Sequence, residues 1–136
     1  MKALRLFLTG LIMASFMGSG ESYAAGMTDA TQTVSGGGVT VAVTYVNPSN
    51  NESPRFEVAL NTHSVGLDSY DFKTLAVLRD GTGKTYSPIK VENKGGGHHR
   101  QVTLTFPKIS PKAKRVEIVI KDIAEVKERT FRWNLE

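Results

Sequence analysis

Hydrophobic and polar side chains alternate along much of the chain after residue 38. In Val39–Asn47, three valines and a tyrosine occupy every second position, and threonine or alanine fills most positions between them. A period of two with β-branched residues predicts a strand that buries one face. The same pattern recurs in four later segments: Arg55–His63, His99–Pro107, Arg115–Ile123 and Arg129–Leu135.

The remaining segments complete an all-β pattern. Leu75–Val91 is predicted to form two short strands joined by a hairpin turn at Asp80–Gly83. Ser69–Ala76 has the pattern of a single helical turn. About seven short strands in roughly 110 residues predict one immunoglobulin-like antiparallel β-sandwich, with an eight-stranded barrel as the alternative. The aromatic pair Phe131 and Trp133, at period two, is expected in the core.

The first 25 residues are predicted to be a cleaved secretory signal peptide. Lys2 and Arg5 precede the apolar run Leu6–Met17, and small residues follow as far as Ala25. The run is shorter than the roughly 20 residues that a membrane-spanning helix needs, so a short membrane anchor is the weaker alternative. Cleavage after Ala25 leaves residues 26–38 as a flexible N-terminal segment or an edge strand, and residues 39–136 as the sandwich.

Composition supports export. The chain has no cysteine, so neither a disulfide nor a cysteine-linked lipid can form, and a periplasmic or secreted location is expected. The net charge is +4, of which Lys2, Arg5 and Glu21 contribute +1. The densest basic run, Lys108–Arg115, is typical of a solvated loop with at most weak attraction to an anionic envelope surface. We expect no nucleic-acid partner, and no transmembrane segment after signal cleavage.

The three histidines are the clearest candidates for a functional site. His63 ends one predicted strand, while His98 and His99 follow the glycines at 95–97 and begin another. Strand ends can meet at one rim of an antiparallel sandwich, where loops carry function. Three imidazoles suit a transition metal such as copper or zinc. The candidate additional ligands are three nearby carboxylates, Asp68, Asp71 and Glu92.

The histidine pair also has a structural interpretation. Neighbouring residues on a strand point to opposite faces, so His98 and His99 cannot both hold one ion from a regular strand. The alternation along the strand places His98 on the core side with Val102. If the histidines instead serve to fix their loops, His63 and His99 are the inward-pointing rings. A histidine at a loop boundary often pins the loop through a ring N–H. The protein would then be a non-catalytic structural or interaction module that docks on an envelope protein through an edge strand or rim loops.

The same segments resemble a known kind of domain. The stretch from Phe56 through "NTHSVGLDSYDF" to "GGGHHRQVTLTFP", with a late "FRW", is similar to an uncharacterised family of exported immunoglobulin-like β-sandwich domains. The similarity covers roughly residues 39 to 133. It centres on Thr62-His63-Ser64 and Gly97-His98-His99, which implies that these two segments act as one unit.

No pattern in the sequence indicates an enzyme. Ser64 beside His63 is not an activated nucleophile, because neighbours point apart in extended chain. No serine lies in a glycine-flanked elbow, and Gly81–Tyr86 has neither the spacing of a phosphate loop nor a following helix. A small exported binding protein is therefore the prediction, with a metal ion or an envelope protein as its partner.

Overall fold

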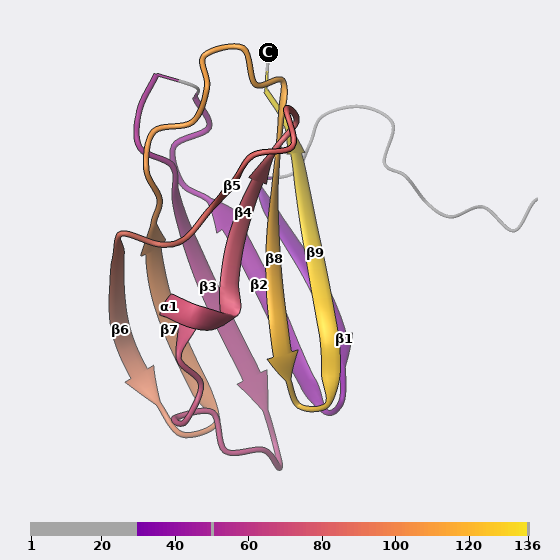
Figure 1. Cartoon of the computed structure of the whole chain (residues 1–136). Helices are drawn as coiled ribbons and strands as arrows, with labels where there is room; N and C mark the ends of the chain where they lie inside the picture. The colour runs from indigo at the N-terminus through magenta and orange to yellow at the C-terminus, as the bar shows by residue number, and fades with distance from the viewer. Residues whose placement is uncertain (1–29, 50, 136) are drawn as a thin grey trace, which may run out of the picture.

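The computed structural model describes residues 30–49 and 51–135, which form two antiparallel β-sheets packed face to face (Figure 1). The strand orders are β1-β2-β3-β7-β6 and β5-β4-β8-β9. The elements are β1 (Thr31–Gly36), β2 (Val39–Tyr45), β3 (Arg55–Thr62), α1 (Phe72–Leu75), β4 (Ala76–Asp80), β5 (Thr85–Tyr86), β6 (Lys90–Gly96), β7 (His99–Thr105), β8 (Arg115–Ile123) and β9 (Val126–Asn134).

The predicted β-sandwich is confirmed, and the barrel alternative is wrong because the strands divide into two separate sheets. The expected count of seven strands is too low, since the two sheets hold five and four. The strands beyond those seven are β1 and β6, both at the edges of the larger sheet, and β1 matches the edge-strand alternative for residues 26–38. The helical turn, the Asp80–Gly83 hairpin and the buried Trp133 are as predicted. The signal peptide predicted for residues 1–25 lies outside the described residues.

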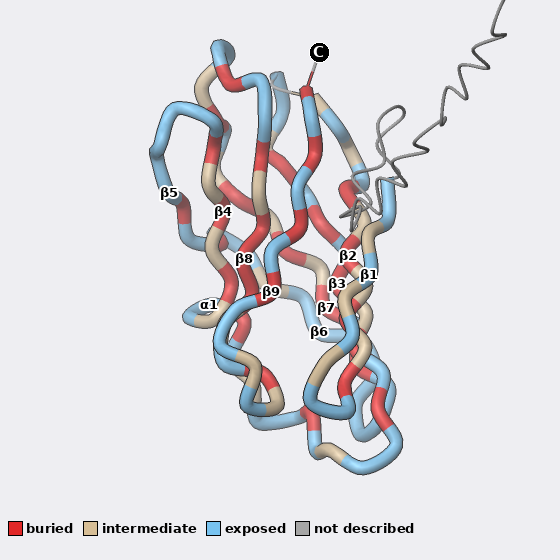
Figure 2. Tube along the Cα trace, turned by 90° about the vertical axis from the view of Figure 1, so that its right-hand side faces the viewer, coloured by how far each residue is buried: buried red, intermediate tan, exposed pale blue. Residues whose placement is uncertain are grey.

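The core follows from the alternating pattern. Along β2 every valine is buried while the residues between are half-exposed, and β3, β7, β8 and β9 alternate in a similar way. Figure 2 shows buried and exposed positions succeeding one another along these strands. Burial of the apolar face at roughly 25 cal/mol per Å² is the main stabilising term for such a sandwich. The opposite face of the larger sheet is left polar.

An aromatic cluster fills one part of the core. Phe56 stacks on Tyr45 with ring centroids 4.4 Å apart, and contacts Trp133 at 5.3 Å and Phe106 at 5.8 Å. Offset and edge-to-face pairs at these distances add to the burial energy of each ring. The cluster joins β2 and β3 of one sheet to β9 of the other, so it stabilises the packing of the two layers.

One side of the sandwich is closed by β1. The Gln32 side-chain amide donates to the carbonyl of Arg132 on β9 and accepts from the Arg132 backbone N–H at 3.0 Å. The indole N–H of Trp133 donates to the carbonyl of Ala30 at 3.2 Å. β1 is therefore tied to the second sheet, whereas β6 at the other edge of the larger sheet has no neighbour beyond β7 among the described strands.

Two hairpin tips interlock beside β1. Gly37 has φ +62°, and a Cβ there would lie 2.1 Å from the carbonyl oxygen of Ala124, so only glycine fits this contact. The glycines at 36–38 therefore end β1 and form its turn into β2. The facing turn holds Ala124 and Glu125 at φ +51° and +64°, a conformation that costs free energy for residues other than glycine.

Asp80 organises the β4–β5 turn at the opposite end. It is buried, and its carboxylate accepts hydrogen bonds from the Thr82 hydroxyl and backbone, the Lys84 N–H and the Tyr86 hydroxyl. Burial acts to raise the pKa of Asp80, but these hydrogen bonds outweigh it and hold the pKa below its ordinary value. The charged carboxylate is thus the form that the folded turn stabilises.

Replacement of Asp80 should make the free energy of unfolding less dependent on pH in the acid range. A lowered folded-state pKa contributes stability that is present above the unfolded pKa, about 3.9, and is lost as the pH falls through the folded value. We expect Asp80→Asn to lower the free energy of unfolding by about 1–3 kcal/mol at neutral pH, with the deficit shrinking in acid. Urea denaturation across the pH range measures both. A deficit that stays constant in acid, or an equal one in the exposed-site control Asp122→Asn, contradicts this role.

Candidate functional site

The glycines before the histidine pair form a hairpin turn. Gly95 and Gly96 end β6, and Gly97 and His98 form the two-residue turn into β7. Gly97 has φ +68° at the first turn position, where a II′ turn requires glycine. A Cβ on Gly97 would meet nothing within 4 Å, so the backbone conformation rather than crowding demands glycine there. The turn therefore positions His98 outside the regular strand.

The structure brings the three histidines to one end of the sandwich. β3 and β7 are antiparallel neighbours, with Asn61 opposite His99. The Thr62 N–H then donates to the carbonyl of His98 at 3.0 Å, and His63 is the next residue along the chain. We call His63, His98 and His99 the histidine rim. The THS and GHH segments are thus adjacent in space.

All three histidine side chains are exposed. The expectation that His63 and His99 point inward is wrong, and so is the placement of His98 on the core side, because His98 lies in the turn and the inward positions of β7 begin at Arg100. His99 shares the outer face with Gln101, and its Nδ1 lies 2.6 Å from the side-chain oxygen of Asn61. His99 therefore links β7 to β3, while within the described residues the other two rings form no hydrogen bond.

Each acidic residue proposed as an additional ligand has another partner. Asp68 accepts from the Gly97 N–H at 3.0 Å and so fixes the histidine turn. Asp71 caps α1 by accepting from the Lys73 N–H at 3.0 Å. Glu92 pairs with Lys90 at 2.9 Å, and this contact is the main cause that holds the pKa of the exposed Glu92 carboxyl below its ordinary value. Across residues 30–49 and 51–135, no three histidine, cysteine or acidic side chains gather closely enough to hold a metal ion.

Arg100 supports the histidine rim from inside. It is 8% exposed, and its guanidinium donates to the carbonyls of Leu67 and Tyr70 at 2.8 and 2.7 Å and lies over the Phe72 ring. A third hydrogen bond reaches the Asn93 side chain at 2.6 Å. Arg100 thus fastens the loop after β3 to the sheet. Its signal in the sequence is a charged residue at an inward strand position, which demands buried partners.

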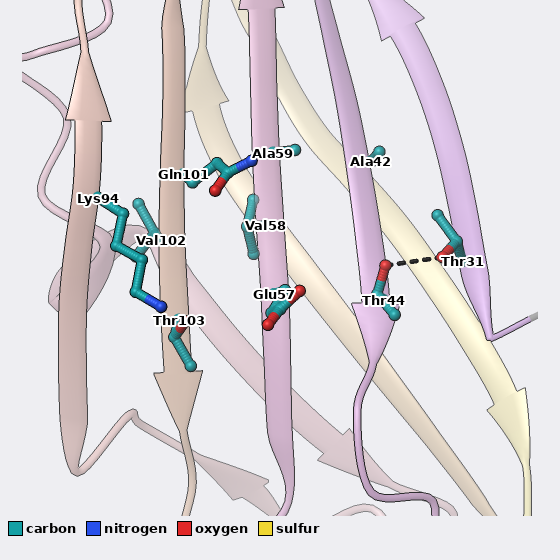
Figure 3. Close-up of a pocket in the computed structure, with 10 residues that line it drawn as sticks. All are labelled: Thr31, Ala42, Thr44, Glu57, Val58, Ala59, Lys94, Gln101, Val102 and Thr103. Atoms are coloured by element: carbon teal, nitrogen blue, oxygen red, sulfur yellow. Dashed lines mark hydrogen bonds between the residues drawn. The ribbon is translucent and has the colours of Figure 1, made fainter.

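The outer face of the five-stranded sheet carries a hollow that the sequence pattern does not indicate. Ala42 on β2 lies opposite Ala59 on β3, which lies opposite Gln101 on β7, which in turn lies opposite Lys94 on β6. Two alanines side by side leave a depression across the strands, with a volume of about 230 Å³. Figure 3 shows the ten residues that line it. We call this depression the cross-strand trough.

Hydrogen-bonding side chains surround the alanine floor. On one side are Thr44, Glu57 and Thr103, which are neighbours across three strands. Thr44 and Thr31 share a hydrogen bond of 2.7 Å at the β1 end. Lys94 closes the other end, and its side chain extends toward Thr103 in Figure 3. The trough therefore presents hydroxyl, amide, carboxylate and ammonium groups together.

A second hollow extends the trough toward the histidine rim. It has a volume of about 180 Å³ and shares Ala59, Lys94 and Gln101 with the trough. Asn61 and His99 line its far side. Since Asn61 and His99 are already joined by a hydrogen bond, they form a fixed polar wall. The two hollows make one continuous polar surface along β3 and β7.

Comparison of the chain with models of known families, with characterised proteins and with solved structures found no match. The resemblance to exported sandwich domains therefore remains a prediction. No helix in the described part of the chain is long and apolar enough to cross a membrane.

Proposed function

We propose that this protein is a non-catalytic binding module of the cell envelope, and that the cross-strand trough binds a hydroxyl-rich ligand such as a short oligosaccharide. The observation that carries the proposal is the pair Ala42 and Ala59, which creates a hollow floored by small side chains on a polar, uncovered sheet face. The signal-peptide pattern of residues 1–25 supports placement in the envelope.

The chemistry of the trough favours a hydroxyl-rich ligand over a protein surface. Protein interfaces concentrate aromatic, methionine and arginine side chains at their centre, and the trough lining contains none of these. Gln101 offers both a donor and an acceptor, Thr44 and Thr103 do the same through hydroxyls, and Lys94 only donates. Sugar hydroxyls donate and accept, so they match this mixture.

The carboxylates near the trough favour binding over hydrolysis. Cleavage of a glycosidic bond ordinarily uses two carboxyl groups, of which one has a raised pKa and acts as the acid. Glu57 is the one carboxylate in the trough lining. Glu92 lies on β6 opposite Thr103. Lys90 lowers the pKa of its carboxyl and so favours the charged form. A lowered pKa disfavours the protonated form, so Glu92 is poorly suited to act as the acid.

Filling the trough should abolish binding without unfolding the protein. Ala59→Leu places a larger side chain on the half-exposed floor outside the core, where substitutions usually change stability by no more than about 0.5 kcal/mol. We expect it to weaken binding of a short oligosaccharide at least about tenfold by calorimetry, with an unchanged melting temperature. The control Thr105→Leu places the same leucine side chain on the same sheet face outside the trough lining. If the two variants bind the oligosaccharide with equal affinity, the proposal is contradicted.

A histidine-bound metal is the second candidate, favoured by three exposed imidazoles at one rim. Because the Asn61 oxygen occupies Nδ1 of His99 and the described residues hold no ready-made ligand group, we expect Cu(II) and Zn(II) to bind no more tightly than about 10 μM. Calorimetric titration checks this. Tighter binding that is lost in both His63→Ala and His98→Ala establishes the metal site instead.

A further inference from the structure

The end of the sandwich away from the histidine rim carries a basic hollow. The β4–β5 turn, the loop before β8 and the end of β9 come together there, at the top of Figure 1. The hollow has a volume of about 370 Å³. Its lining consists of Gly81, Thr82, Lys112, Lys114, Arg115 and Asn134. Three of these six residues carry a cationic side chain, and none is an acid.

The frame of this hollow is held by backbone contacts. The Gly81 N–H donates to the carbonyl of Arg115 at 3.0 Å, and the Leu135 N–H donates to the carbonyl of Lys114 at 2.7 Å. Ile109 and Ala113 are buried in the core on either side of Lys112. The backbone of the basic run is therefore anchored to the sandwich, while its cationic side chains are exposed to solvent as the sequence predicts.

The nearby acids balance only part of this positive charge. Both oxygens of Asp80 are occupied by the β4–β5 turn and by Tyr86. The Glu117 carboxylate lies 2.8 Å from Arg132 and 3.6 Å from Arg115, so its closer ion pair is with Arg132. Within residues 30–49 and 51–135, neither Lys112 nor Lys114 forms an ion pair. The hollow thus keeps an excess of positive charge.

We infer that this hollow binds a phosphate-type anion. Two lysine ammonium groups and an arginine guanidinium supply charge, and the Asn134 amide supplies a neutral hydrogen bond, whereas the Thr82 hydroxyl donates to Asp80. The hollow leaves room for a phosphate that belongs to a larger molecule. An anionic phospholipid headgroup and a soluble phosphorylated saccharide share this chemistry. This site is separate from the cross-strand trough and does not depend on it.

The first experiment titrates the purified protein with inorganic phosphate and follows backbone amide signals by NMR. We expect the signals of Gly81, Thr82 and residues 112–115 to shift, and the apparent affinity to fall about tenfold or more in the double variant Lys112→Ala/Lys114→Ala. The control is Lys73→Ala/Lys127→Ala, which removes the same charge from exposed positions outside the hollow. Its affinity should match that of the unmodified protein.

The second experiment identifies the source of the anion. Sedimentation with phosphatidylcholine vesicles, with and without phosphatidylglycerol, supports a lipid headgroup if binding needs the anionic lipid and is lost only in the hollow variant. Phosphate binding at the hollow without vesicle binding supports a soluble phosphorylated ligand. Shifts that are absent at about 10 mM phosphate, or equal weakening in both double variants, overturn the site. Neither outcome changes the result expected for oligosaccharide binding by Ala59→Leu. Failure of the phosphate site and failure of the trough are therefore distinguishable.

Discussion

Phe56→Ala should lower the free energy of unfolding by about 3–5 kcal/mol. Phe56 is fully buried and is the member of the aromatic cluster that contacts Tyr45, Phe106 and Trp133. Its removal leaves a cavity between the two sheets and takes away three ring contacts at once. A domain of this size has a free energy of unfolding of about 5–15 kcal/mol, so the variant is expected to be partly unfolded at physiological temperature. Urea denaturation followed by tryptophan fluorescence measures the change.

Phe56→Leu is the matched control, since it keeps most of the buried volume while losing the ring contacts. We expect it to cost less than half as much as the alanine change. If Phe56→Ala shifts the free energy of unfolding by less than about 1 kcal/mol, the rings do not join the two sheets as described.

Arg129→Ala is expected to cost about 2–4 kcal/mol. Arg129 is 1% exposed, and its guanidinium donates to the carbonyls of Ile123 and Gly36 at 2.8 and 2.6 Å. Burial lowers the pKa of Arg129, with Tyr70 opposing the effect, yet an arginine remains charged in proteins. Truncation removes both of these hydrogen bonds, and with them the clamp between the β1–β2 and β8–β9 turns.

The control for this clamp is Lys127→Ala, an exposed cation on the same strand. It should change stability by no more than about 0.5 kcal/mol. Hydrogen exchange adds a local readout, because loss of Arg129 should speed exchange at Val39 and Val126 beside the two turns before it affects the aromatic cluster. Uniform exchange across the molecule contradicts a local clamp.

The strands with a buried face could be predicted because burial leaves a period-two signature. β1 and β6 escaped this signature for a physical reason. Both are edge strands with largely exposed residues, so TQTVSG and KVENKGG carry no apolar alternation. Their places in the sheet are fixed by pairing with β2 and β7 instead. Charged side chains on an edge strand, as on β6, are typical of proteins that avoid edge-to-edge association.

The convergence of the histidines could also be anticipated, because strand ends of neighbouring antiparallel strands meet. The side-chain directions could not. His98 belongs to a two-residue turn, and the partner of His99 is Asn61, a residue 38 positions away. The cross-strand trough was equally hidden, since Ala42 and Ala59 are unremarkable until the register places them opposite each other. The periodicity of a sequence predicts which face of a strand is buried. The residues that form a site on a sheet depend on the register between neighbouring strands.

The most direct test of the binding proposal maps the ligand surface. Backbone amide signals of the purified protein would be followed while short glucose and N-acetylglucosamine oligomers are added. The proposed function predicts that at least one oligomer shifts the signals of Ala42, Ala59 and Gln101 and leaves those of His63 and His98 unchanged. Shifts confined to the histidine rim, or none with any oligomer of the series, would contradict the trough as the binding site.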